Sequence, residues 1–86
     1  YGYKSNETDA LRMIDIYFRM GNFHKVAEIY EALIKLNPKN PQYYASLAAA
    51  YKKTGEIGKA IKAAQAAAQI DPAFAKEAQD FINSLR

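Results

Sequence analysis

Residues 51–72, YKKTGEIGKAIKAAQAAAQIDP, repeat the landmarks of residues 17–38, YFRMGNFHKVAEIYEALIKLNP. Tyr17 and Gly21 return as Tyr51 and Gly55, and each segment ends at a proline, so every landmark recurs after 34 residues. A constant period between about 20 and 50 residues is typical of proteins built from stacked structural repeats. The spacing therefore predicts two copies of one unit.

The first copy is predicted to be a pair of amphipathic helices, because its apolar residues follow the 3.6-residue helical period. We expect these helices over residues 7–20 and 23–36, with Asn6 as the N-terminal cap and Gly21 as the left-handed turn residue between them. The first of these helices is apolar except for a narrow stripe, which is formed by Thr8, Arg12, Asp15 and Arg19.

The second copy repeats this pattern, with helices expected over residues 42–53 and 57–70. Pro41 can stand as the first helical residue with Asn40 as its cap, because proline is well tolerated in the first turn. Gly55 turns the chain, and Pro72 ends the second helix because the residue before a proline is pushed out of the helical region.

A fifth amphipathic helix is predicted after Pro72. Its apolar face is formed by Phe74, Ala78, Phe81, Ile82 and Leu85. Its polar face is formed by Lys76, Glu77, Asp80, Asn83 and Ser84. A terminal helix with one polar side is what a stack of repeats needs at its end, and we expect Phe81 to be its main apolar anchor.

The pattern as a whole predicts an all-α solenoid of two helix-turn-helix hairpins and a C-terminal solvating helix, five helices in all. The chain divides into an N-terminal extension (1–6), a first repeat (7–40), a second repeat (41–74) and a capping helix (75–86).

Length, charge and cysteine content exclude several classes of function for these 86 residues. The net charge of +3 is not gathered into the basic stripe of a nucleic-acid binder, and no run of about 18 apolar residues could span a bilayer. We therefore expect neither a nucleic-acid partner nor membrane insertion.

Catalytic and metal-binding residues are also scarce in this sequence. Cysteine is absent, and His24 has only Glu28 as a second metal ligand at helical spacing, so no metal or cofactor is expected. No serine lies near the histidine in the repeat geometry, so nucleophilic catalysis has no base at hand. The chain is predicted not to be an enzyme.

The two copies resemble the tetratricopeptide repeat, whose pattern orders a large aromatic, a Leu-Gly pair, Tyr, Ala, an aromatic, Ala and Pro along 34 residues. The second repeat carries this pattern in Tyr44, Leu47, Ala48, Tyr51, Ala60, Ala67 and Pro72. Ala64 departs from it, because the pattern has an aromatic there. In the first repeat, Tyr17, Tyr30 and Pro38 match.

The resemblance implies a protein–protein interaction scaffold that binds a peptide or partner-protein segment on its concave face. By resemblance, this face is formed by Leu11, Asp15, Phe18, Arg19, Ala45, Ala49, Lys52, Lys53, Lys76, Gln79 and Asn83. A segment with acidic character is expected, because it would meet Lys52, Lys53 and Lys76. Chaperone-binding relatives hold a C-terminal carboxylate with Asn and Lys or Arg, and no such clamp is expected here. The matching places hold Leu11, Asp15, Ala45 and Ala49.

Three of these residues also have a purely structural interpretation. Lys52 and Lys53 lie in the last turn of a helix, where cations favour the helix dipole without any ligand. Phe18 can serve as an anchor for a partner or pack against neighbouring parts of a longer protein. The largely apolar first helix favours an alternative function, which is architectural: packing against the parent chain, or self-association as a homodimer.

Overall fold

The structure, a computed structural model, describes residues 6–85, and within this range it contains five α-helices, one short 3-10 helix and no strand. The elements are α1 (Asn6–Met20), α2 (Phe23–Leu36), α3 (Pro41–Thr54), α4 (Ile57–Ile70), η2 (Pro72–Phe74) and α5 (Ala75–Ser84). The predicted all-α class is confirmed, and most helix ends fall within one residue of the expected positions. The expected N-terminal extension lies outside the described residues except for Asn6, which is the first residue of α1 rather than its cap.

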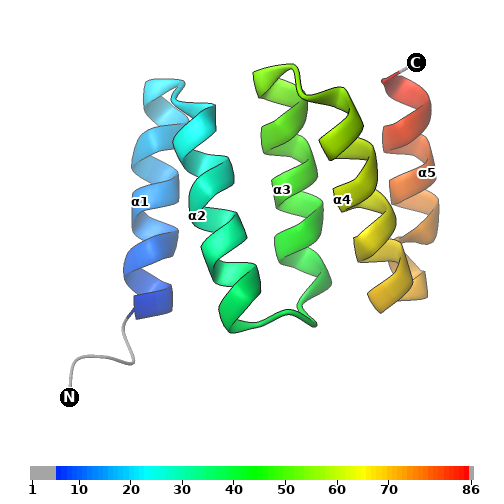
Figure 1. The fold of residues 1–86 in the computed structure, drawn as a ribbon, viewed down its shortest axis with the longest axis horizontal. Coiled ribbons are helices and arrows are strands. Elements are labelled where there is room, and N and C mark those ends of the chain that lie inside the picture. Colours follow the sequence, from blue (N-terminus) through cyan, green and yellow to red (C-terminus); the bar gives the residue numbers. More distant parts are fainter. Residues whose placement is uncertain (1–5, 86) are drawn as a thin grey trace.

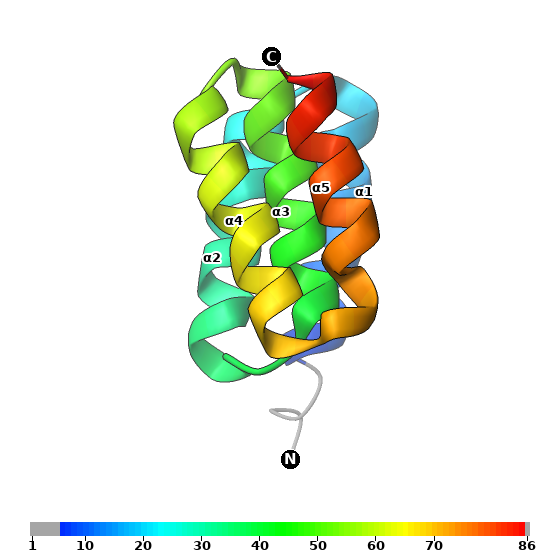
Figure 2. The same cartoon turned by 90° about the vertical axis from the view of Figure 1, so that its right-hand side faces the viewer.

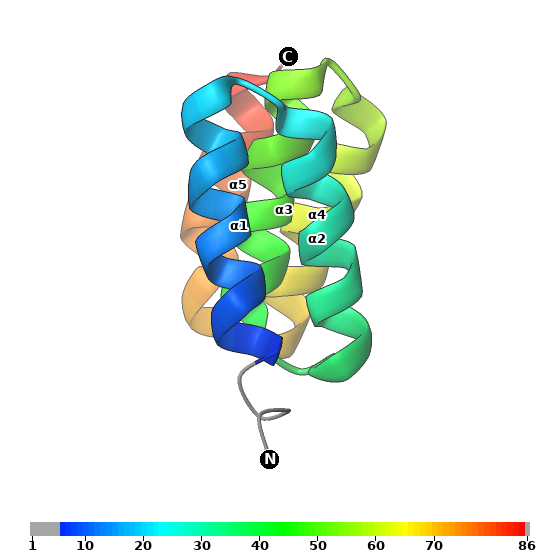
Figure 3. The same cartoon turned by 90° about the vertical axis from the view of Figure 1, so that its left-hand side faces the viewer.

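The helices form two antiparallel pairs, α1 with α2 and α3 with α4, and α5 then lies along α4 (Figure 1). Viewed from either end of the row, α1 and α5 lie on one side of α3, and α2 and α4 lie on the other (Figures 2 and 3). The whole measures 43 × 27 × 15 Å. Each helix therefore packs on its neighbours in the chain, as in a solenoid.

The two interhelical turns have the same backbone structure, which explains why both need glycine. Gly21 and Gly55 have φ of 79° and 89°, a left-handed conformation that residues with a Cβ rarely adopt. The next amide in each turn donates to a carbonyl five residues back, Asn22 to Tyr17 and Glu56 to Tyr51, both at 2.9 Å. This pattern closes a helix C-terminus, and it recurs after one repeat period.

Asparagine and aspartate side chains cap the N-termini of α3 and η2. The side-chain oxygen of Asn40 accepts from the Gln42 amide at 3.0 Å, with Pro41 as the first residue of α3, as predicted. Asp71 caps η2 in the same way, accepting from the Ala73 amide at 3.0 Å. This single 3-10 turn before α5 was not predicted.

The core runs through both hairpins and differs in character between them. In the first, Val26 and Leu33 of α2 are almost completely buried. In the second, α4 buries only alanines, namely Ala60, Ala63, Ala64 and Ala67. Alanine favours the helix and lets α3 and α4 approach closely, but it fills less of the space toward α5.

The capping helix α5 is anchored by residues other than the predicted Phe81. Its buried residues are Ala78 and Ile82, whereas Phe81 is only partly buried and has the Lys52 ammonium 5.8 Å from its ring centre. Ile82 lies four residues after Ala78 and shares its face, while Phe81 is turned by about 100° from Ile82. The prediction that Phe81 is the main anchor was therefore wrong, although the predicted polar face is exposed throughout.

Candidate functional site

Helix α3 is packed between α2 and α4, and its exposed residues are Gln42, Ala49, Lys52 and Lys53. These four residues lie within about 100° of one another around the helix axis, so they form one open strip. Ala45 belongs to the same strip and is half-buried. Sequence reasoning missed Gln42, although it lies seven residues, or two helical turns, before Ala49.

On α1, the four predicted residues are all exposed. Asp15 and Arg19 form an ion pair at 3.3 Å, as their spacing predicts. Leu11 is 43% exposed and Phe18 is 52% exposed, so both large apolar side chains are open to solvent. The Phe18 ring also meets Phe23 edge to face, with the ring centres 5.2 Å apart. Phe18 therefore packs within the chain and remains half open.

Lys52 and Lys53 are in the last turn of α3 and diverge toward different neighbours. The Lys53 ammonium lies 5.7 Å from the Phe23 ring centre, and the Lys52 ammonium lies 5.8 Å from that of Phe81. Each cation is favoured by the negative face of its ring. Among residues 6–85, neither lysine has a carboxylate within ion-pair distance, so both charges are open to solvent.

The predicted residues of α5 form one exposed stripe of this helix. Lys76, Gln79 and Asn83 follow one another at steps of three and four residues. The Gln79 side-chain amide donates to the Asn83 side-chain oxygen at 3.1 Å. We call the exposed predicted residues of α1, α3 and α5, together with Ala45 and Gln42, the inner face.

Two apolar depressions accompany the inner face, one for each pair of neighbouring odd-numbered helices. The first has a volume of about 150 Å³ between α1, α2 and α3. It is lined by Ile14, Phe18, Val26, Tyr30, Ser46, Ala49 and Ala50. The second has a volume of about 200 Å³ between α3, α4 and α5. It is lined by Ala45, Ala48, Ala64, Ala67, Phe74, Glu77, Ala78 and Phe81.

Two family models match this arrangement of helices. A family model described as a TPR repeat matches residues 15–55, and one described as a tetratricopeptide repeat matches residues 41–74. This chain belongs to the tetratricopeptide repeat family. The repeats make it a protein–protein interaction module, since solenoids of this kind present an extended surface to their partners.

Several curated proteins with tetratricopeptide repeats are similar to this chain. The TPR repeat-containing thioredoxin TTL4 of Arabidopsis thaliana is 29% identical over 87% of the chain. The small glutamine-rich tetratricopeptide repeat-containing protein 2 of Mycosarcoma maydis is 43% identical over 57%, and Hsp70-Hsp90 organizing protein 2 of A. thaliana is 33% identical over 70%. The chain covers only 11%, 14% and 10% of these proteins, respectively.

In the part of the chain that the structure describes, no group of three His, Asp or Glu residues is arranged to hold a metal ion. None of the helices between residues 6 and 85 combines the length and apolar character needed to cross a membrane.

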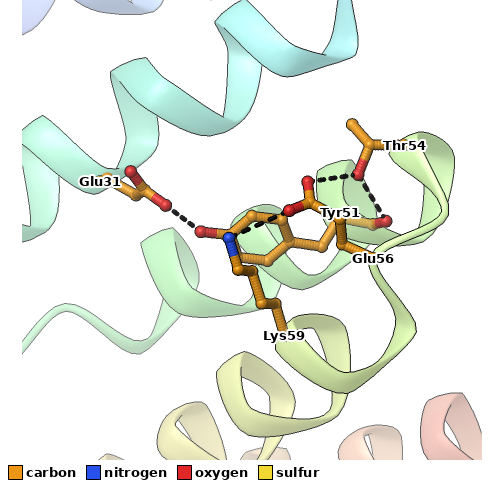
Figure 4. Close-up of polar contacts among 5 residues, drawn as sticks. All are labelled: Glu31, Tyr51, Thr54, Glu56 and Lys59. Atoms are coloured by element: carbon orange, nitrogen blue, oxygen red, sulfur yellow. Dashed lines mark hydrogen bonds and ion pairs between the residues drawn. The ribbon is translucent and has the colours of Figure 1, made fainter.

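A polar network lies on the other side of the tetratricopeptide stack, where α2 meets α3 and α4 (Figure 4). Glu56 pairs with Lys59 at 3.0 Å, and the Thr54 hydroxyl lies 2.9 Å from a Glu56 carboxylate oxygen. Hydrogen bonding to Lys59, and then to Thr54, lowers the pKa of Glu56. The same bond to Glu56 raises the pKa of Lys59. The network ties the start of α4 to the end of α3.

Tyrosine hydroxyls of α3 reach carboxylates of the first hairpin in two places. Tyr51 donates to Glu31 of α2, and Tyr43 donates to Glu7 of α1. The bond to Glu7 raises the pKa of Tyr43 to about 12, with burial as the second cause. Glu31 and Lys35 stand at the four-residue spacing of a helical ion pair, but the Glu31 carboxylate accepts from Tyr51 of the next repeat instead.

Proposed function

We propose that the chain binds an extended or helical segment of a partner protein on its inner face, and that this segment is acidic. The observation that carries the proposal is the open strip of α3, where two lysines without carboxylate partners among the described residues stand beside two apolar depressions. In this proposal, residues 7–40 and 41–74 are the two repeats, and residues 75–86 form the C-terminal cap.

A partner on the inner face would cover exposed apolar groups and meet exposed positive charges. Phe18 and Leu11 are exposed apolar groups, so covering them with a partner removes apolar surface from water at roughly 25 cal/mol per Å². Lys52, Lys53 and Lys76 are exposed cations among the residues of the proposed inner face, and they would favour and orient an acidic segment. Because these charges are solvent-exposed, their contribution should weaken as salt is added.

The names of two relatives, Hsp70-Hsp90 organizing proteins of A. thaliana and Glycine max, support a role in holding other proteins. The four positions at which related chaperone-binding repeats grip a terminal carboxylate hold Leu11, Asp15, Ala45 and Ala49 here. None of these side chains is a cation or an asparagine. We therefore propose recognition of an internal acidic segment rather than of a chain terminus.

A charge-reversal titration tests this proposal. A partner recovered by affinity capture is titrated calorimetrically into the wild type and into the double variant Lys52→Glu/Lys53→Glu. We expect the variant to bind roughly tenfold more weakly or worse, with a shallower salt dependence. The control is Lys35→Glu/Lys62→Glu, which makes the same charge change at exposed positions outside the inner face. Equal weakening by both pairs, or by neither, would refute the inner face as the site.

A second candidate function is favoured by the outer face of α1, defined by Met13, Ile16 and Met20. These side chains are 45%, 54% and 67% exposed. One repeat period later, Met13 and Ile16 correspond to Leu47 and Ala50, which are buried where α2 packs on α3. In the first repeat, no helix within residues 6–85 covers the equivalent face.

We infer for this face a role in self-association, with a second copy of the chain as its occupant. The spacing of Met13, Ile16 and Met20 gives a seam on which two α1 helices can pack. Sedimentation velocity over a range of concentrations should show a dimer that Ile16→Glu abolishes and the exposed-site control Arg12→Glu preserves. A monomer at every concentration would contradict self-association and leave a helix from elsewhere in a longer parent chain as the covering element.

A further inference from the structure

One position of the repeat is filled differently in the two hairpins. Tyr30 of α2 and Ala64 of α4 are separated by one period of 34 residues. The Tyr30 ring packs near that of Tyr43 in α3, with the ring centres 6.2 Å apart. One period after Tyr43 stands Glu77 of α5, so the second interface has a methyl group and a carboxylate where the first has two rings.

This difference accounts for the larger of the two depressions, which we call the Ala64 depression. It lies between α3, α4 and α5 and includes both Ala64 and Glu77 among its lining residues. Five of its eight lining residues are alanines, and Phe74 and Phe81 supply two aromatic walls. The space is open because the chain has no large side chain at the position that Tyr30 fills in the first repeat.

The size and lining of the Ala64 depression suit one aromatic ring. Its volume of about 200 Å³ exceeds the ~150 Å³ of an apolar cavity known to hold benzene. Aromatic walls favour an incoming ring through edge-to-face or offset contacts. Glu77 is the one ionisable group among the lining residues, and its carboxylate can accept a hydrogen bond from a polar ring tip.

We infer that the Ala64 depression receives an aromatic side chain of the partner segment, a tyrosine or tryptophan whose O–H or N–H donates to Glu77. The partner would then supply in trans the ring that Tyr30 supplies within the chain. The inference rests on the proposed function, because Ala45 belongs both to the inner face and to this depression. Lys52, which lies over the Phe81 wall, places a cation beside the anchor for an acidic neighbour in the partner.

The test uses p-cresol as the probe, because it is the ring and hydroxyl of tyrosine alone. Amide and aromatic NMR signals of the intact chain are followed during the titration. We expect saturable shifts at Ala45, Ala64 and Ala78 and at the rings of Phe74 and Phe81. Toluene, which lacks the hydroxyl, should bind several-fold more weakly, and Glu77→Leu should remove that difference.

Two variants of α4 keep the test specific. Ala64→Tyr places a ring in the depression, so it should abolish the saturable shifts while the protein stays folded and its melting temperature rises. Gln65→Tyr adds the same ring at the next position, which is exposed, and should leave the titration unchanged. If Ala64→Tyr unfolds the chain, Ala64→Leu serves as a smaller filler with the same expected loss.

The inference is overturned if no saturable shift appears up to the solubility limit of p-cresol, if the shifts lie elsewhere, or if Ala64→Tyr binds as well as the wild type. These outcomes are separate from failure of the proposed function, which the lysine variants test. A partner that loses affinity with Lys52→Glu/Lys53→Glu but not with Ala64→Tyr would retain the inner face and refute the aromatic anchor.

Discussion

The hydroxyl of Tyr51 in α3 donates a hydrogen bond to the carboxylate of Glu31 in α2, and so joins the second hairpin to the first (Figure 4). Tyr51 is buried, and the Lys59 ammonium lies 5.6 Å from its ring centre. The tyrosine therefore contributes its ring to the core and its hydroxyl to the contact between repeats. The chain has only two hairpins, so each contact between them should make a large contribution to the free energy of unfolding.

Removing this hydroxyl should destabilise the fold without changing its shape. Tyr51→Phe leaves the ring in place but deprives Glu31 of its donor, and a hydrogen bond to a charged group contributes about 1.5 to 3 kcal/mol. We expect a loss near the lower end, because Glu31 is exposed to solvent. Urea unfolding measures the loss. Tyr44→Phe is the control, because its hydroxyl has no hydrogen bond within residues 6–85, and a similar loss there would contradict the assignment.

Alkaline pH should weaken the fold through Tyr43. The pKa of this phenol is raised from 10.0 to about 12 in the folded protein by its hydrogen bond to Glu7. Between these values the folded state binds more protons than the unfolded state, so the free energy of unfolding falls as pH rises from about 10 to about 12. Urea unfolding at a series of pH values measures this slope.

Tyr43→Phe isolates that contribution from the titration of the other tyrosines and lysines. The variant should be less stable near neutral pH by about 1.5 to 3 kcal/mol, because the lost hydrogen bond has a charged acceptor, and its stability should fall less steeply above pH ~10. Parallel pH profiles for wild type and variant would show that the Tyr43 hydroxyl does not carry this pH dependence.

Two glycines near the second interhelical turn, Gly55 in the turn and Gly58 at the start of α4, should respond to substitution by alanine with stability changes of opposite sign. A Cβ meets no atom within 4 Å at either Gly55 or Gly58, so crowding does not decide the outcome. Gly55 has φ of 89°, and Gly55→Ala should cost about 1 kcal/mol because alanine is strained there. Gly58 is helical, and Gly58→Ala should stabilise by about 0.5 to 1 kcal/mol. Thermal unfolding of both variants measures the signs, and equal signs would contradict this account of the turn.

Much of the fold could be predicted because its signals are local. Gly21, Gly55, Asn40 and Pro41 act within one turn of chain, and the structure places the ends of the four hairpin helices within one residue of the predicted positions. The 34-residue period then determines that the hairpins stack in the same way. The short helix η2 was not predicted, because a proline at position 72 is equally compatible with a non-helical break between α4 and α5.

The features that could not be predicted depend on how the helices pack. The hydrogen bond from Tyr51 to Glu31 joins residues 20 positions apart, and that from Tyr43 to Glu7 joins residues 36 apart. Neither hydrogen bond could be predicted before it was known how α3 packs against α1 and α2. The burial of Ile82 rather than Phe81 has the same origin, since both are apolar and only the position of α4 decides between them. The depressions also follow from packing, although the absence of an aromatic at Ala64 was visible in the repeat pattern.

The most direct test of the account locates the partner on the surface of the chain. A photo-cross-linking amino acid is placed at Ala49, on the exposed strip of α3, or at Lys62, on the exposed side of α4, and each protein is irradiated with its captured partner. The account predicts a covalent adduct from position 49 that disappears with Lys52→Glu/Lys53→Glu, and none from position 62. An adduct from position 62, or one from position 49 that survives the charge reversal, would contradict the inner face as the binding surface.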